Sequence, residues 1–283
     1  MQKRNVLNSP RLLELKKNRR KVFFRKTLFL AVIILIIFFG LAYLSHLDSL
    51  NITEVEVGGN RVIDTEALKT TVNQQIARKY LWLFPKTNIL IYPQNAIKNE
   101  LRDKFKRVKD VSLSIKDGKI LAISLIEREA KYTWCGITIN LEEEKCYFLD
   151  ADGYIFDEAP YFSEEVYFKF YGLENYNPLG TFFSEQNFKQ LISFKDTLAG
   201  MELRPIAMYV KNDGNAEVIL SKGSSASVPP KIIFKMDSDF QNIAENLDAA
   251  LHTEPLLSKF KNKYSSLQYI DLRFENRVYD KFQ

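Results

Sequence analysis

Hydrophobic positions form one unbroken run near the N-terminus of the chain. Residues 27–45 read TLFLAVIILIIFFGLAYLS and contain no charged side chain. About twenty apolar residues wound as an α-helix cover the hydrocarbon core of a bilayer, and a helix satisfies its own backbone hydrogen bonds there. We therefore expect residues 27–46 to form a single transmembrane helix. The alternative is a cleaved signal peptide, which has a shorter apolar core and a small-residue cleavage site that this segment lacks.

The pattern after the apolar run changes first to that of a strand and then to that of a helix. Ile52–Val57 alternates between apolar and polar positions, as a half-buried strand does. Asp64 suits the N-cap of a helix, and apolar residues at near-helical spacing follow it. Residues 80–92 then form an apolar connector. These features predict a strand, a turn and one helix.

A second helix and a hairpin complete this first region after the predicted span. Pro93 suits the first position of a helix, where its missing N–H has no partner to lose. Two alternating segments then flank Asp117-Gly118, a strong hairpin signal. The order strand, helix, helix, strand, strand predicts a compact βααββ domain over residues 50–128, with a sheet covered by two helices.

From residue 129 onward the pattern consists of short strands rich in Tyr and Phe, separated by turn clusters. Helical spacing recurs at residues 184–198 and 239–251, and the chain ends on an extended stretch, residues 269–282. We expect residues 129–283 to form a second, mostly antiparallel β-rich domain with a few helices. The fold class predicted for the whole chain is therefore α+β behind one transmembrane helix.

Charge indicates the orientation of the predicted span. Residues 1–26 contain ten Lys and Arg against one acid, Glu14, whereas the other flank begins with Asp48 and Glu54. Because cations beside a span stay in the cytoplasm, the basic tail is expected inside and the two domains outside. The whole chain carries +5, so the part after the basic tail is mildly acidic. We therefore expect no nucleic-acid partner.

Two cysteines, Cys135 and Cys146, fall in the exported part. They lie on two predicted strands joined by a loop, which would place them nearly opposite each other. An oxidising compartment permits a disulfide bond, which for so short a loop adds about 3 kcal/mol to the free energy of unfolding. We favour this bond; two buried thiols that never meet are the alternative.

Motifs of catalysis and metal binding are missing from the sequence. There is no G-x-S-x-G, H-E-x-x-H or phosphate-binding Gly-rich loop. The histidines are His46 and His252 alone, so a zinc site is not expected. Ser258–Lys261 matches S-x-x-K but has no K-T-G after it, and a solvated helix face explains it better. We expect no catalytic residue, cofactor, metal or small-molecule substrate, and hence a scaffold or binding module rather than an enzyme.

Four segments, in this order behind one span, carry a family resemblance. They are Val55–Asn60 (VEVGGN), Ile123–Arg128 (ISLIER), Met208–Leu220 and Tyr269–Phe274 (YIDLRF). Together they resemble the FtsQ/DivIB family of cell-division proteins, whose first exported module is a POTRA domain. The sequence departs from the family pattern at Glu129, where the family commonly has Pro, and at Phe274, where it has Tyr.

The resemblance implies a POTRA domain at residues 50–128, an FtsQ-like β domain at 129–283 and a function in the bacterial divisome. Such a protein is a non-catalytic scaffold in the plasma (inner) membrane at the division septum. It recruits or regulates septal peptidoglycan synthesis by binding membrane partners of the FtsB and FtsL type. A POTRA-type envelope transport or assembly module and an anchored cell-wall enzyme are the alternatives.

In the family that the chain resembles, the partner adds a strand to the end of the β domain. Carried over to this sequence, the partner-binding residues are Arg273, Phe274 and Asn276, on a terminal strand, Tyr269–Lys281, that we expect at the sheet edge. For Asp271 we prefer an internal ion pair with Arg273. For Arg273 and Phe274, a structural role and a partner contact remain equal alternatives.

Overall fold

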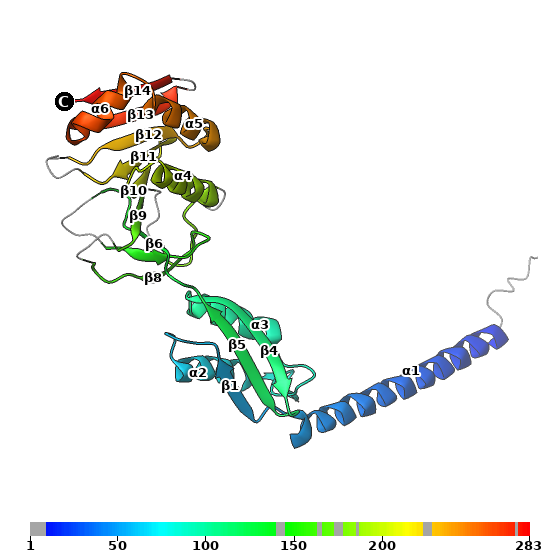
Figure 1. Ribbon diagram of the computed structural model, residues 1–283. Helices are drawn as coiled ribbons and strands as arrows, with labels where there is room; N and C mark the ends of the chain where they lie inside the picture. The colour runs from blue at the N-terminus through cyan, green and yellow to red at the C-terminus, as the bar shows by residue number, and fades with distance from the viewer. Residues whose placement is uncertain are drawn as a thin grey trace, which may run out of the picture. The chain divides into compact units, whose positions relative to one another are not determined.

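The computed structural model has a long N-terminal helix, partly apolar, followed by a part rich in β-sheet (Figure 1). The structure describes residues 10–139, 145–162, 166–172, 178–184, 187–222, 228–274 and 277–283. The chain forms two compact units, the first made of residues 1–101 and 110–125 and the second of residues 102–109 and 126–283. The predicted mixture of helix and strand behind an apolar helix is confirmed.

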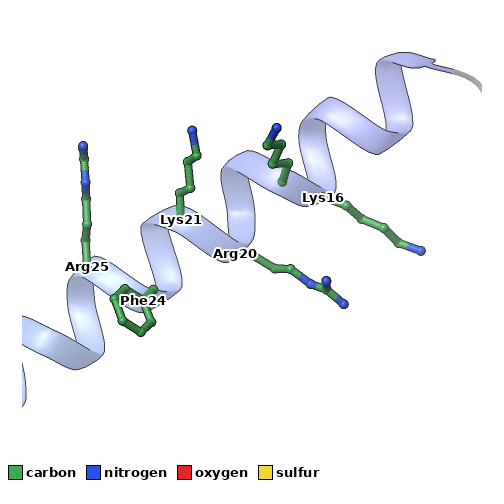
Figure 2. A pocket seen from close by; sticks show the side chains of 6 residues that line it. Lys16, Arg20, Lys21, Phe24 and Arg25 are labelled. Atoms are coloured by element: carbon green, nitrogen blue, oxygen red, sulfur yellow. The ribbon is translucent and has the colours of Figure 1, made fainter.

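Helix α1 spans Pro10–Ser45 and contains the apolar run. Within the described chain, its stretch Glu14–Ser45 is the one helix long and apolar enough to cross a membrane, by length and composition. Its first part is basic instead: Lys16, Arg20 and Arg25 project from more than one side of the helix (Figure 2). One continuous helix therefore joins a basic segment to an apolar one.

The first unit holds a three-stranded sheet in the order β1-β5-β4, in which β1 runs parallel to β5. Strands β4 and β5 form a hairpin around Asp117-Gly118, as predicted. The bounds of these elements are β1 Glu54–Gly58, α2 Thr65–Ile76, β2 Lys79–Tyr80, β3 Phe84–Pro85, α3 Gln94–Lys104, β4 Val108–Lys116 and β5 Ile120–Glu127.

The helices of the first unit begin where their sequences predict. Asp64 caps α2 by accepting a hydrogen bond from the backbone N–H of Ala67 to its Oδ2 atom at 2.8 Å, which satisfies one of the free donors of the first turn. Both helices turn apolar side chains inward: Leu68, Val72, Ile76, Ile97 and Leu101 are all buried. The apolar connector between the helices forms a small hairpin of β2 and β3.

Residues 102–109 belong to the second unit, although the pattern assigns them to the first domain. Two ion pairs link these residues to other residues of the second unit. The guanidinium of Arg107 donates from Nε to Oδ2 of Asp157 at 3.1 Å, and the ammonium of Lys109 lies 3.0 Å from Oδ2 of Asp152. No local pattern in the sequence records such distant charge pairs.

The second unit is built on a nine-stranded sheet in the order β14-β13-β12-β11-β10-β9-β6-β7-β8. Three neighbouring pairs run parallel, β12 with β13, β9 with β10 and β6 with β9, and the other pairs run antiparallel. The strand bounds are β6 Tyr132–Trp134, β7 Tyr147–Leu149, β8 Ile155–Glu158, β9 Phe168–Gly172, β10 Pro205–Val210, β11 Asn215–Leu220, β12 Lys231–Lys235, β13 Leu267–Phe274 and β14 Arg277–Phe282.

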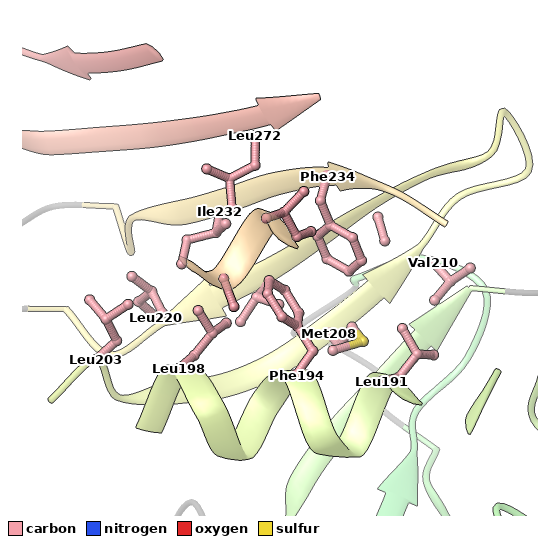
Figure 3. Close-up of a cluster of buried hydrophobic side chains, with 14 of the residues drawn as sticks. Leu191, Phe194, Leu198, Leu203, Met208, Val210, Leu220, Ile232, Phe234 and Leu272 are labelled. Atoms are coloured by element: carbon pink, nitrogen blue, oxygen red, sulfur yellow. The ribbon is translucent and has the colours of Figure 1, made fainter. Parts of the chain in front are cut away.

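Three helices pack on one face of this sheet: α4 (Phe188–Gly200), α5 (Phe240–Leu251) and α6 (Leu256–Lys263). Figure 3 shows the part of this layer between α4 and the strands, where Phe194 of α4 lies near Phe234 of β12, their ring centroids 5.0 Å apart. The opposite face carries the disulfide bond between Cys135 and Cys146 and a separate cluster with Tyr171 and Ala207.

The end of the chain differs from the prediction of a single edge strand. Strands β13 and β14 run antiparallel, with Phe274 opposite Arg277, so β13 is an interior strand between β12 and β14. The expectation that Tyr269–Lys281 forms one edge strand is therefore wrong. Alternation of period two continues on both sides of a short reversal, so the pattern cannot distinguish one long strand from two short ones.

Candidate partner-binding edge of the sheet

The nine-stranded sheet ends in β8 on one side and in β14 on the other. The outer side of β8 is paired at its start. Ile155 donates its N–H to the carbonyl oxygen of Thr181 at 2.8 Å and accepts from the N–H of Gly180 at 2.8 Å. A β-bridge between Tyr154 and Phe182 extends this cover. Strand β8 is thus a partly closed edge.

Strand β14 has one neighbouring strand in the described part of the sheet, β13. Just after β14, Gln283 donates its N–H to the carbonyl oxygen of Ser266 at 2.9 Å, so the odd-numbered residues of β14 direct their backbone groups toward β13. Strand geometry then directs the backbone groups of Val278, Asp280 and Phe282 away from the sheet. No described strand pairs with these outward groups, and such a row is a template for an added strand.

The side chains of β14 anchor the strand from the helix side. Val278 and Phe282 pack against the main core. The carboxylate of Asp280 accepts from the ammonium of Lys259, on α6, at 2.8 Å. Three contacts therefore hold the edge strand in place, although its outer backbone groups face away from the sheet.

Two aromatic rings lie together at the start of the β13–β14 hairpin. Phe274 is 53 % exposed and Tyr279 is 46 % exposed, and their ring centroids are 5.3 Å apart in an edge-to-face arrangement. Aromatic side chains that remain exposed supply large contact areas in protein interfaces. The pair therefore offers an apolar anchor beside the row of unpaired backbone groups.

Arg273 forms a two-point ion pair within its own strand. Its Nε atom donates to Oδ1 of Asp271 at 2.9 Å, and its Nη2 atom donates to Oδ2 at 2.6 Å. Burial by itself raises the pKa of the Asp271 carboxyl, but the hydrogen bonds from Arg273 outweigh it and hold that pKa below its ordinary value. The same bonds raise the pKa of Arg273. The expected internal ion pair of Asp271 is confirmed.

A second buried carboxylate lies in the same row across the sheet. Glu217 on β11 is opposite Ile233 on β12, which is opposite Asp271 on β13. Its Oε1 atom accepts from Lys211 at 2.7 Å and from Lys231 at 2.9 Å. Burial raises the pKa of Glu217, yet the two lysines outweigh it and lower that pKa. Paired charges therefore occupy the face of the sheet opposite the helices.

A surface depression of about 590 Å³ adjoins the end of β13. Arg273 and Phe274 line it together with Asp213, Lys235 and Asp237. The depression contains both signs of charge beside an exposed aromatic ring. This composition suits a polar protein segment.

The structure places the three sequence-predicted partner residues differently. Phe274 is exposed at the hairpin, next to the open edge. Arg273 lies beside it, with its guanidinium bonded to Asp271, and Asn276 lies outside the described residues. Sequence reasoning missed Tyr279, whose place on β14 follows from the alternation of R-V-Y-D-K-F once the reversal before it is known.

Among the described residues, no group of three or more His, Cys, Asp or Glu side chains could hold a metal ion. No protein-family model matches this chain, and no curated protein matches its sequence. The open edge at β14 is the candidate site, defined by the strand order and the exposed Phe274–Tyr279 pair.

Proposed function

We propose that this protein is a non-catalytic, single-span membrane scaffold that binds a partner protein through the β14 edge of its second unit. The observation that carries the proposal is the open edge, whose outward backbone groups at Val278, Asp280 and Phe282 lie beside the exposed Phe274–Tyr279 pair. An incoming strand pairs with the backbone groups, and its side chains contact the two rings. The backbone bonds supply affinity, and the rings supply specificity.

The orientation of the chain across the membrane follows from the basic segment of α1. The cations before the apolar run stay in the cytoplasm, which leaves both compact units outside. Electrostatic attraction to anionic lipids reinforces this orientation by about 1 kcal/mol for each cation near the surface. The exported units thus meet partners in the extracytoplasmic space, where the Cys135–Cys146 bond is stable.

The biological setting that we propose is the bacterial divisome. Support comes from the order of motifs that resembles the FtsQ/DivIB family, with the first unit as a POTRA domain and the second as the partner-binding β domain. The partners are then membrane proteins of the FtsB and FtsL type, and the protein is located at the septum. Its role is to recruit or regulate septal peptidoglycan synthesis.

Removing a single backbone N–H donor tests whether the partner binds by adding a strand to β14. Asp280→Pro removes an outward N–H that β13 does not use, and edge strands tolerate proline at such positions. We expect this variant to lose co-purification of the partner from crosslinked dividing cells. The matched variant Asp280→Ala also loses the ion pair to Lys259 but keeps the N–H, and it should retain the partner. Equal capture by both variants would remove strand addition at β14 from the proposal.

Localisation separates a division scaffold from a transport module. A fluorescent fusion of the full chain should concentrate at midcell in dividing cells, because the partners assemble there. An even distribution around the envelope would contradict the divisome assignment and favour an envelope transport or assembly role. Depletion of the protein should give filaments without septa.

A further inference from the structure

The connector between α2 and α3 exposes large apolar side chains. We name residues 79–91 the β2–β3 loop; it contains the strands β2 and β3 and the turn between them. Trp82 is 91 % exposed, Leu90 77 % and Leu81 69 %. Exposed apolar residues gathered in this way mark a surface that contacts another apolar phase or partner. Exposing these side chains to water is unfavourable, so the loop is expected to contact an apolar surface or phase.

The β2–β3 loop packs directly on the apolar helix α1. The rings of Phe84 and Phe38 meet edge to face with their centroids 5.3 Å apart. Ala42 and Ser45 are buried on the same side of α1, since positions 38, 42 and 45 are spaced four and three residues apart. One face of the last two turns of α1 is therefore covered.

Hydrogen bonds fix the loop to the end of α1. The carbonyl oxygen of Ser45 accepts from the side-chain amides of Asn51 at 2.9 Å and Asn88 at 3.2 Å. The hydroxyl of Thr87 donates to the Oδ1 atom of Asn51 at 2.7 Å, and Ile89 donates its N–H to Leu50 at 2.9 Å. Carbonyl groups at a helix end need such partners. The loop and the helix end therefore form one joint.

The contact between Phe84 and Phe38 determines how deep the β2–β3 loop lies relative to the bilayer that α1 spans. Phe38 precedes Ser45 by seven positions, which corresponds to about 10 Å along the helix axis. When α1 spans a bilayer, Phe38 lies below the outer surface of the membrane, and Phe84 lies beside it. We propose that the tip of the β2–β3 loop enters the outer leaflet, with Leu81 and Trp82 in contact with lipid. This inference rests on the proposed transmembrane role of α1.

The chemistry of the loop suits the membrane interface. Tryptophan is enriched at the level of the lipid headgroups, and Arg78, Lys79 and Lys86 flank the tip on stems long enough to reach phosphate groups. The ammonium of Lys86 lies 4.9 Å from the ring centre of Tyr80. The turn also satisfies backbone groups internally: Leu83 donates to Tyr80 and Lys86 donates to Arg78, each at 3.1 Å. Few backbone groups are then left to lipid.

The backbone conformation at the tip supports a functional role for Leu81 and Trp82. Leu81 has φ 48° and Trp82 has φ 60°, which lie in the left-handed region that bulky residues avoid. Tight hairpin turns of this kind ordinarily use Asn-Gly. Placing Leu and Trp there adds the cost of exposed apolar surface in water. Contact with lipid offsets that cost.

Fluorescence of Trp82 in membranes tests the inference. The chain has two tryptophans, so Trp134→Phe leaves Trp82 as the sole reporter in the full-length protein. Reconstituted into vesicles that contain brominated phospholipids, this variant should show blue-shifted emission and lose most of its intensity. The reverse variant, Trp82→Phe, reports on the buried Trp134 of the second unit and should keep its emission.

Two matched substitutions distinguish insertion of the loop tip into lipid from a general effect of a charge at an exposed position. In the Trp134→Phe background, Leu81→Asp places a charge at the tip and should restore Trp82 emission, whereas Tyr161→Asp, at an exposed position of the second unit, should not. Flotation of vesicles after an alkaline wash tests the span independently. A chain that floats while Trp82 stays unquenched would overturn the inference alone. A chain that fails to float would contradict the proposed span and the inference with it.

Discussion

Glu217 and Asp271 illustrate how single residues shape the second unit. Both carboxyl groups are buried, at 6 % and 5 % exposure, and a buried carboxylate is costly unless it is paired. Lys211 and Lys231 pair with the first, and Arg273 pairs with the second. The guanidinium that the family resemblance assigns to a partner is thus already engaged within the fold.

The two ion pairs predict how stability depends on pH. Because the pKa of each carboxyl is lower in the folded than in the unfolded protein, the stabilisation is complete above about pH 5 and is lost as pH falls through the lowered folded values. Urea unfolding at several pH values should therefore show a falling free energy below about pH 4. Asp271→Asn with Glu217→Gln should flatten that dependence, and an unchanged slope would contradict the assignment.

Arg273 can be tested apart from Phe274. Arg273→Ala leaves the buried Asp271 without its partner and should lower the free energy of unfolding by about 1–3 kcal/mol. Phe274→Asp changes an exposed ring and should leave that free energy nearly unchanged while it abolishes partner capture. Chemical denaturation and co-purification measure the two effects. If Phe274→Asp unfolds the protein instead, the ring has a structural role.

Among the elements, local signals in the sequence predict some features well and others poorly. The cap at Asp64 and the turn at Asp117-Gly118 depend on neighbouring residues, and the structure contains both. The position of β13 depends on its parallel pairing with β12 across a distant part of the chain, which no local pattern encodes. Phe274 is proposed from the family resemblance and not from a local pattern, whereas the separate edge strand β14 and Tyr279 could not be proposed from the sequence.

A disulfide bond links the end of β6 to the start of β7. Cys135 follows β6 and Cys146 precedes β7, and the disulfide bond between them closes a short loop. Replacing both by Ser should lower the free energy of unfolding by about 3 kcal/mol, chiefly because the unfolded chain gains freedom. Denaturation of the oxidised protein and of the double variant measures the difference. Equal stabilities would show that the bond contributes little.

For the whole molecule, each part contributes one physical property. Helix α1 supplies an apolar length sufficient for a bilayer, the first unit carries the β2–β3 loop against that helix, and the second unit presents the open β14 edge. The proposed scaffold needs all three, because anchoring brings a docking strand to one surface of the cell. We propose that the partner binds at this edge outside the membrane.

Photocrosslinking in dividing cells can detect this contact at the level of a single residue. A photoreactive amino acid placed at Tyr279 should form an adduct with an extracytoplasmic partner, and the same amino acid at the exposed Tyr161 should not. Asp280→Pro should abolish the adduct at Tyr279, and Asp280→Ala should preserve it. If no adduct forms at Tyr279, or if it persists in the proline variant, the account of β14 as the docking strand is contradicted.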